Sequence, residues 1–198
     1  MDDKDKGRRD FLYTVATGMG VAGAATAAVP FVRSMQPAAD TMAASTTEFD
    51  LASLSPGELK VIEWRGQPVF VLHRTPEMIK EIRGHNQMLK DPQSRAIPEV
   101  QAVWMKSEAQ RIDRSIRPEY LVISAVCTHL GCVPTFKPTP GQKDWGNSVP
   151  SDWPGGWHCE CHGSYYDLSG RVIKGSPAPY NLHAIPYKYL HDATVLIG

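Results

Sequence analysis

Two short boxes of cysteine and histidine limit most strongly what this chain of 198 residues can fold into. The first reads CTHLGC from Cys127 to Cys132, and the second reads CECHGSYY from Cys159 to Tyr166. All 4 cysteines lie in these boxes, whereas a disulfide framework would scatter them. Thiols and imidazoles supplied by two tight loops indicate a metal centre.

Two other uses of such residues fit the spacing less well. A structural zinc site usually takes C-x(2–4)-C pairs, whereas the spacings here are C-x-H, C-x(4)-C, C-x-C and C-x(2)-H. A thiol-disulfide enzyme would use C-x-x-C near a βαβ unit, and the sequence has neither. An iron-sulfur centre of mixed ligation is therefore favoured, and a zinc-stabilised module without redox function is the alternative of a different class.

The chain beyond residue 47 is typical of a mainly antiparallel β domain. Short runs rich in β-branched and aromatic residues are separated by Gly and Pro. These runs cover residues 48–54, 59–64, 68–74, 120–126, 170–175 and 194–198. Thr75, Pro76 and Glu77 resemble an N-cap and a first turn, which predicts a short helix over about 76–83; residues 101–115 are expected to hold a second.

An uncharged run near the N-terminus predicts one transmembrane helix. The 22 residues from Phe11 to Val32 carry no charge, and as a helix they would cover about 33 Å against a hydrocarbon core of about 30 Å. The basic residues before this run are Lys4, Lys6, Arg8 and Arg9. Only Arg33 follows it before residue 60, so residues 1–10 are expected in the cytoplasm, a helix over 11–33, and the remainder outside.

The N-terminal residues also resemble a twin-arginine signal, an address for proteins exported after folding. Arg8 and Arg9, followed by Phe11 and Leu12, carry this likeness. Cleavage near Ala27 is the alternative to a retained anchor, but the run is longer than the roughly 7–15 apolar residues of a cleaved signal. Residues 34–47, rich in Ala, Ser and Thr, predict a flexible hinge or tether before a domain over 48–198.

The charge balance excludes one class of partner. Lys and Arg total 21 and Asp and Glu total 21, so the formal net charge is zero. The chain has no basic field that would hold a nucleic-acid backbone, and we predict no nucleic-acid partner.

The pair CTHLGC and CECHGSYY resembles the Rieske iron-sulfur subunit of the quinol–cytochrome c reductase (cytochrome bc) complex, bacterial type. In a Rieske centre two histidines replace two cysteines on one iron of a 2Fe-2S cluster. The resemblance implies an all-β fold: an antiparallel Rieske-type β-sandwich with a small cluster-binding subdomain, preceded by one N-terminal transmembrane helix. The cluster-binding loops would lie at about 127–134 and 157–180.

The resemblance also implies roles for individual residues. The cluster ligands would be Cys127 and Cys159 on one iron, and His129 and His162 on the other. Cys132 and Cys161 would form a disulfide between the loops. Soluble Rieske ferredoxins and ring-hydroxylating oxygenases generally lack this second cysteine pair, so its presence favours the quinol-oxidising branch.

Further residues around the cluster match the family. Hydroxyls of Ser164 and Tyr166 would donate hydrogen bonds to sulfur, which favours the reduced form, and Gly163 belongs to the same motif. Leu130 would form part of the apolar surface around the histidines. The proline loop, which covers the cluster from a third side, would comprise Gly175, Pro177 and Pro179.

One residue departs from the family's pattern. Glu160 occupies the place where the family usually has proline. A carboxylate beside two ligands would disfavour the reduced state and lower the reduction potential. The stretch from Lys137 to Gly156 is also longer than a minimal connection.

The function implied is that of an electron-transfer subunit of an oxidoreductase and translocase. It would oxidise quinol at the outer face of the membrane, with His162 and His129 as the catalytic residues, and pass the electron to a c-type cytochrome, coupled to proton release. Partners would be a cytochrome b subunit, a c-type cytochrome subunit, quinol and membrane lipid, in a dimeric complex. The location would be the bacterial inner membrane, single-pass, with the soluble domain in the periplasm. The redox alternative is the Rieske subunit of a periplasmic molybdenum oxidase of the arsenite type.

Overall fold

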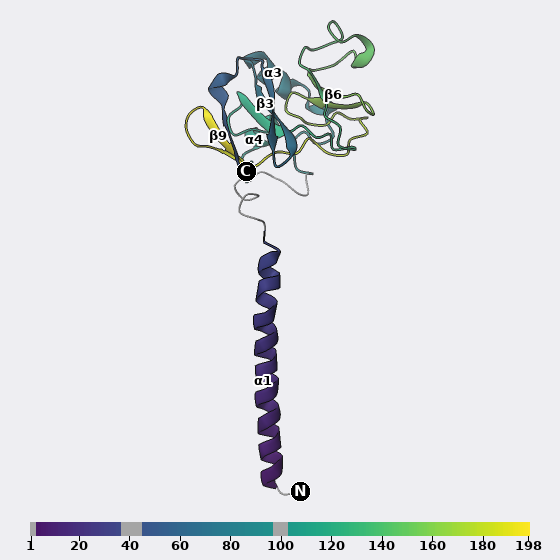
Figure 1. The fold of residues 1–198 in the computed structure, drawn as a ribbon. Coiled ribbons are helices and arrows are strands. Elements are labelled where there is room, and N and C mark those ends of the chain that lie inside the picture. Colours follow the sequence, from purple (N-terminus) through teal and green to yellow (C-terminus); the bar gives the residue numbers. More distant parts are fainter. Residues whose placement is uncertain (1–2, 37–44, 97–102) are drawn as a thin grey trace. The chain divides into compact units, whose positions relative to one another are not determined.

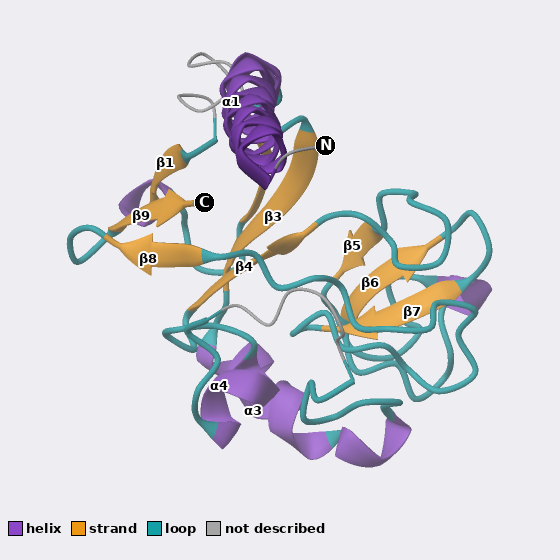
Figure 2. Ribbon diagram, turned by 90° about the horizontal axis from the view of Figure 1, so that it is seen from below, coloured by secondary structure: helices purple, strands orange, loops and turns teal. Residues whose placement is uncertain are grey.

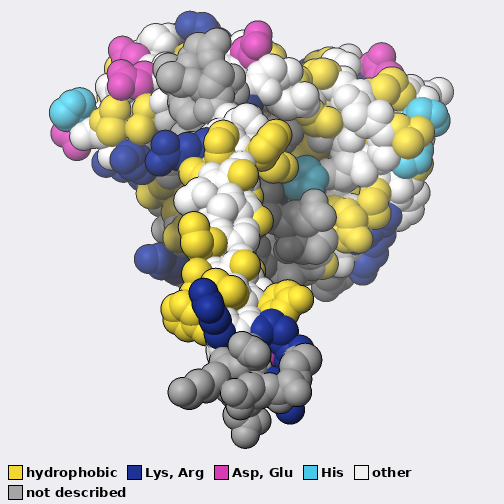
Figure 3. All heavy atoms as spheres, turned by 60° about the horizontal axis from the view of Figure 1, so that its bottom comes forward, with side chains coloured by type: hydrophobic (Ala, Val, Ile, Leu, Met, Phe, Trp, Pro, Cys, Tyr) yellow, Lys and Arg dark blue, Asp and Glu magenta, His cyan; other side chains and the backbone are white. Residues whose placement is uncertain are grey.

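The computed structural model describes residues 3–36, 45–96 and 103–198, and the chain divides into two compact units, Met1–Ala43 and Ala44–Gly198 (Figure 1). The first unit contains one long helix, α1 (Asp3–Ser34). Its segment Lys6–Ser34 is long and apolar enough to cross a membrane, a property that a signal sequence shares. Apolar and small side chains cover most of α1, and basic side chains gather near its N-terminal end (Figure 3).

Helix α1 begins at Asp3, before the uncharged run that starts at Phe11, so charged residues near the N-terminus are also helical. Of the tether expected over 34–47, Ser34 is the last residue of α1 and Thr47 is the first residue of a strand. Residues 37–44 lie outside the described part of the chain.

Within its described residues, the second unit contains three antiparallel sheets of three strands each, and Figure 2 shows how they are arranged. The first sheet has the order β1-β9-β8, formed by β1 (Thr47–Asp50), β9 (Thr194–Ile197) and β8 (Tyr187–Tyr189). The second has the order β2-β3-β4, formed by β2 (Leu59–Trp64), β3 (Gln67–His73) and β4 (Tyr120–Ser124). The third has the order β5-β6-β7, formed by β5 (Thr135–Lys137), β6 (Gly156–Cys159) and β7 (Ser164–Asp167).

The sheet β2-β3-β4 lies between two hydrophobic clusters, which explains why β3 and β4 are apolar almost throughout. Successive side chains of a strand point to opposite faces. One face packs on the β1-β9-β8 sheet and contributes Val69, Val71 and Val122 to a cluster with Val195 and Ile197. The other face packs on the third sheet and contributes Phe70, Leu72, Leu121 and Ile123 to a cluster with Trp157 and Tyr166. The predicted fold class, an antiparallel β-sandwich preceded by one N-terminal helix, is therefore confirmed, with the third sheet packed on the other face of the second.

A two-residue turn joins β2 to β3. Trp64 pairs with Gln67, and the intervening Arg65 and Gly66 both have positive φ, 51° and 72°. This is the backbone of a type I′ hairpin, whose twist matches that of the flanking strands. The turn aligns the six residue pairs of the β2–β3 ladder.

The predicted helix over 76–83 is present as α3 (Pro76–Gly84), and the Thr75 hydroxyl accepts a hydrogen bond from the Met78 N–H at 3.4 Å. The second expected helix is shorter than 101–115. It is α4 (Glu108–Asp113), because a capping box at Ser107 begins it and Arg114 ends it in the left-handed conformation, with φ 53°. Single 3-10 turns occur at η1 (Leu51–Ser53), η2 (Asn86–Met88) and η3 (Gly146–Ser148).

Two predicted strands were wrong in part. The run 48–54 is a strand only to Asp50, whose carboxylate accepts the Ala52 N–H at 2.9 Å and starts a 3-10 turn. The run 170–175 contributes only isolated bridges at Val172 and Ile173. There the Asp167 carboxylate accepts backbone N–H groups from Ser169 and Arg171 and forms a 2.7 Å ion pair with the Arg171 guanidinium, so the chain turns instead of extending.

Candidate metal centre

The two cysteine-histidine boxes form loops of the same construction. In the first, the Gly131 N–H donates to the Cys127 carbonyl at 2.9 Å, and in the second the Gly163 N–H donates to the Cys159 carbonyl at 2.9 Å. Both glycines have positive φ, 87° and 77°, a conformation that a residue with a side chain rarely adopts. Each loop therefore begins with a cysteine and closes on a glycine four residues later.

The leading cysteine of each loop is buried in the core. Cys127 and Cys159 are each 2% exposed, carry free thiols and belong to the same hydrophobic cluster as Trp157 and Tyr166. Cys127 follows the end of β4 and Cys159 ends β6, so the two sheets on either side of this cluster bring the thiols together.

The Tyr166 hydroxyl lies 3.1 Å from the Cys127 sulfur. Its oxygen accepts the Thr128 N–H at 3.2 Å, and the Thr128 hydroxyl donates to the Tyr180 carbonyl at 2.6 Å. Cys127 Sγ is then the nearest acceptor for the Tyr166 proton. Burial, followed by the hydrogen bond to Cys127, raises the pKa of Tyr166, so the hydroxyl stays protonated and can donate.

The two thiols titrate as a pair. Burial acts to raise the pKa of Cys127, but hydrogen bonds, of which that from Tyr166 is the largest, outweigh burial and lower it. Burial and the neighbouring Cys127 raise the pKa of Cys159 to about 11. Of the two thiols, Cys127 is therefore the one that ionises first, and its negative charge disfavours ionisation of Cys159. A bound cation would remove this opposition, because metal ligation requires both thiolates.

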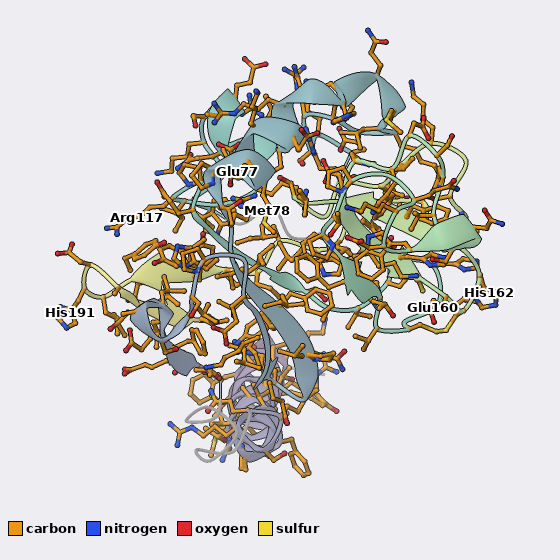
Figure 4. All side chains as sticks on the ribbon, turned by 90° about the horizontal axis from the view of Figure 1, so that it is seen from above. Glu77, Met78, Arg117, Glu160, His162 and His191 are labelled. Atoms are coloured by element: carbon orange, nitrogen blue, oxygen red, sulfur yellow. A yellow bond between two sulfur atoms is a disulfide. The ribbon has the colours of Figure 1, made fainter. Side chains whose placement is uncertain are left out.

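The two histidines of the boxes form a second pair beside the thiols. The ring centroids of His129 and His162 are 4.8 Å apart and the rings are perpendicular. His162 is exposed and lies at the edge of the domain (Figure 4), whereas His129 is half-buried. Nδ1 of His129 is buried and has no hydrogen-bond partner in the described part of the chain. A buried nitrogen without a partner costs free energy unless a further group binds it.

A disulfide joins the two loops near the surface. Cys132 and Cys161 are bonded, with their Cα atoms 6.7 Å apart and 29 residues apart in sequence. The sulfur atoms of Cys132, Cys159 and Cys161 lie within 4.8 Å of one another, but two of them are already bonded and offer no thiolate. The available donors are therefore two thiols and two imidazoles.

A third loop, residues 175–180, is hydrogen-bonded to both boxes. The Ala178 N–H donates to the Ser164 hydroxyl at 3.1 Å, and the Tyr180 carbonyl accepts from Thr128. Lys90 donates to the carbonyls of Ser176 and Ala178 at 2.7 and 2.8 Å. Ser164 is fully buried beneath this loop.

The residues of the site fit a 2Fe-2S cluster. Two thiols on one side and two imidazoles on the other, one of them with an unpaired buried Nδ1, provide two donors for each of two irons. The structure brings the four predicted ligands, Ser164 and Tyr166 into one region, and it leaves Leu130 70% exposed beside them. The ligand set and the roles of Gly163, Gly175, Pro177 and Pro179 stay predictions.

Three polar residues of the site were missing from the sequence prediction. Thr128 connects Tyr166 to Tyr180, Lys90 holds the third loop, and Lys137 reaches the second box. Thr128 could have been noticed because it lies inside CTHLGC. No sequence signal identifies Lys90 or Lys137, since each contacts residues far away in the chain.

Comparisons with known proteins identify relatives of nearly the whole chain. Residues 48–186 match the Rieske [2Fe-2S] domain family, and residues 1–38 match the family described as Ubiquitinol-cytochrome C reductase Fe-S subunit TAT signal. The ubiquinol-cytochrome c reductase iron-sulfur subunit of Allochromatium vinosum is 46% identical over 98% of this chain and 89% of its own length. The protein of the same description from Rhodospirillum rubrum is 42% identical over 98% and 93%.

One solved structure, from a hyperthermophilic respiratory Complex III, is 23% identical, with a TM-score of 0.47 over 91% of this chain and 96% of that one. The assignment does not depend on this weak likeness. It depends on the domain match over most of the chain and on relatives that align with nearly all of it. The chain belongs to the family of Rieske [2Fe-2S] iron-sulfur subunits of ubiquinol-cytochrome c reductase.

Proposed function

We propose that this chain is the electron-transfer subunit of a membrane-bound quinol–cytochrome c reductase and that Cys127, Cys159, His129 and His162 hold its 2Fe-2S cluster. The observation that carries the proposal is the separation of the donors into a buried thiol pair and a more accessible imidazole pair. When bound, the cluster supplies one-electron chemistry, which the side chains of this domain do not provide.

The imidazole pair is the part of the site that a substrate can reach. If Nδ1 of each ring binds metal, Nε2 is the atom left to hydrogen-bond a quinol hydroxyl and to take its proton. The exposed Leu130, which follows His129 directly in the chain, adds an apolar side chain suited to a quinol ring. This is the basis for proposing coupled electron and proton uptake at His162 and His129.

The groups around the thiol pair are the part of the site that sets the reduction potential of the cluster. The Tyr166 hydroxyl donates to a ligand sulfur, and Ser164, fully buried beneath the third loop, is placed to donate to cluster sulfur. Such hydrogen bonds are stronger to the more negative, reduced form. Gly163 closes the second loop, and Gly175, Pro177 and Pro179 complete the cover.

Helix α1 is proposed as the single membrane anchor. The basic residues at its N-terminal end favour a cytoplasmic N-terminus, and this supports the proposal that the Rieske domain lies on the periplasmic side of a bacterial inner membrane. Residues 34–47 are retained as the proposed tether between the two units.

The relatives are named as subunits of ubiquinol-cytochrome c reductase. The proposed partners are therefore a cytochrome b subunit, a c-type cytochrome, quinol and lipid, in a dimeric assembly.

Metal and sulfide analysis of the full chain in detergent tests the proposal. We expect two iron atoms and two acid-labile sulfides per chain, and an EPR signal of Rieske type after reduction. Zinc in place of iron, or iron without labile sulfide, would contradict it. Copurification with a membrane cytochrome b would distinguish the reductase from a molybdenum oxidase.

A further inference from the structure

A buried lysine contacts the cluster-binding region without being part of the ligand set. Lys137 ends β5, and the residue is 5% exposed. Its Nζ lies 3.0 Å from the Ser148 hydroxyl oxygen, 3.2 Å from Nδ1 of His158 and 3.2 Å from Oε1 of Glu160. These three acceptors match the three hydrogens of an ammonium group. The lysine is therefore held in one position with its hydrogen-bonding capacity satisfied.

Glu160 supplies the negative charge that this buried ammonium needs. It is the only acidic residue in ion-pair contact with Lys137 in the described part of the chain. An isolated ammonium in a protein interior is costly, so burial of Lys137 requires a counter-charge or strong acceptors. Glu160 itself is 63% exposed at the side chain, and Figure 4 shows it beside His162 at the same edge of the domain.

The segment between β5 and β6 forms the enclosure around Lys137. Trp153, 2% exposed, donates its indole N–H to the Lys137 carbonyl at 3.0 Å. The ring of Trp145 lies 5.9 Å from the Lys137 ammonium, and its carbonyl accepts from the Ser148 hydroxyl at 2.6 Å. A separate hydrophobic cluster of this segment packs Val149 and Trp153 with Leu89 and Ile173.

The segment leads into β6 through Gly155 and Gly156, where its backbone packs closely against neighbouring backbone. A Cβ at Gly156 would lie 1.9 Å from the Tyr166 carbonyl oxygen, and one at Gly155 would lie 2.3 Å from the Pro138 carbonyl oxygen. Both distances are shorter than any real contact, so only glycine allows β6 to lie this close to β7 and to Pro138. The extra length of residues 138–155 therefore forms a packed element with its own buried cluster.

We propose that Lys137 is a positioning residue that neutralises Glu160 and so keeps the reduction potential of the cluster from falling, and that residues 138–155 exist to hold it. The proposal rests on the cluster assignment given above. Glu160 lies between Cys159 and Cys161, next to one proposed ligand and two residues from His162. A negative charge there disfavours an added electron, and an adjacent positive charge cancels much of its field.

Two single variants and their combination test the charge pair. Glu160→Gln leaves the lysine charge unopposed and should raise the midpoint potential. Lys137→Met, which keeps the side-chain length, leaves the glutamate charge unopposed and should lower it. The double variant should return close to the wild-type value. Midpoints would be measured at one fixed pH on the cluster-loaded full chain, by EPR-monitored redox titration.

Lys143→Met is the matched control. Lys143 lies in the same segment and carries the same charge, but it is exposed and makes no ion pair or hydrogen bond in the described part of the chain. Its replacement should shift the midpoint much less than Lys137→Met, because water screens its charge. Equal shifts in the two variants would overturn the proposal, since only net charge would then matter.

The outcome remains decisive if Lys137→Met does not fold. Glu160→Gln changes an exposed side chain and keeps the lysine, so an unchanged midpoint in that variant alone would overturn the charge pair. A role of Lys137 in folding only would lower the unfolding temperature of Lys137→Met and leave the midpoint of that variant equal to the wild-type value. Absence of iron and labile sulfide from the wild-type chain would instead refute the cluster assignment.

Discussion

Cys127 and Cys159 are each 2% exposed, and the Tyr166 hydroxyl lies 3.1 Å from the Cys127 sulfur, whereas His162 is exposed and His129 is half-buried. The thiol half of the site is surrounded by core residues and neutral hydroxyl donors. The imidazole half faces outward next to the exposed Leu130. In the proposed function this difference corresponds to a division of work, in which the inner half would set the stability and the reduction potential of the cluster and the outer half would meet partners.

The largest expected effect is on the outer half. His162→Cys should abolish the Rieske EPR signature and quinol oxidation, because a thiolate adds negative charge and removes the imidazole N–H. EPR of the reduced protein and steady-state turnover are the measurements. His191→Cys, which changes an exposed histidine elsewhere on the domain (Figure 4), should leave both unchanged. A normal signal and full turnover in His162→Cys would show that this residue is no ligand.

The disulfide that joins the two loops should have the next largest effect. Replacing Cys132 and Cys161 by serine opens a link across 29 residues, and the loop-entropy relation gives a loss of about 3–4 kcal/mol in the free energy of unfolding. Denaturant unfolding of the full chain, with iron retention followed in parallel, measures this loss. A free energy of unfolding equal to that of the wild type would mean that the loops are held by their other contacts alone.

A smaller effect is expected in the inner half. Tyr166→Phe should keep the cluster and lower its midpoint potential, by roughly 60 mV if the lost hydrogen bond is worth about 1.4 kcal/mol more to the reduced form. Tyr165→Phe is the matched control, because its hydroxyl donates to the Ser148 carbonyl at 3.3 Å and touches no thiol sulfur. Equal midpoints for the two variants would make Tyr166 a packing residue.

The smallest expected effect concerns the third loop. Lys90→Met removes two hydrogen bonds to the carbonyls of Ser176 and Ala178 from an exposed side chain, at a cost of about 1 kcal/mol. Hydrogen exchange of the Ala178 amide, which donates to Ser164, should become faster. Lys174→Met is the control, since that lysine donates to the Gln87 carbonyl instead. If the Ala178 amide exchanged at the same rate in both variants, the hydrogen bonds of Lys90 would not be what holds the third loop.

The sequence predicted those parts of the molecule whose cause is local. The apolar runs of β3 and β4 and the N-cap of α3 lie within a few neighbouring residues, and both were found. The strands β5, β7 and β8 were not predicted, because three or four residues outside any longer apolar run are too few to show a clear alternation. The run 170–175 looked like a strand, but a buried ion pair between Asp167 and Arg171 turns it.

The same distinction applies to the site. The two boxes contain their ligands and closing glycines within eight residues, so spacing and family resemblance suggested the donor set. The effect of Glu160 was predicted from its charge alone, and no pattern in the chain points to Lys137, 23 positions earlier. The pairing depends on β5 lying next to β6, a contact that spacing does not reveal.

The oxidation state of the four cysteines follows their burial. Of the four cysteines, the two that are oxidised to a disulfide include the exposed Cys161, whereas the two that remain thiols are 2% exposed. A reagent must reach a sulfur atom to react with it, so an oxidant or a thiol that approaches the folded domain meets the Cys132–Cys161 disulfide before the buried thiols. Burial therefore makes the inner pair less accessible to oxidants and to disulfide exchange than the pair that forms the disulfide.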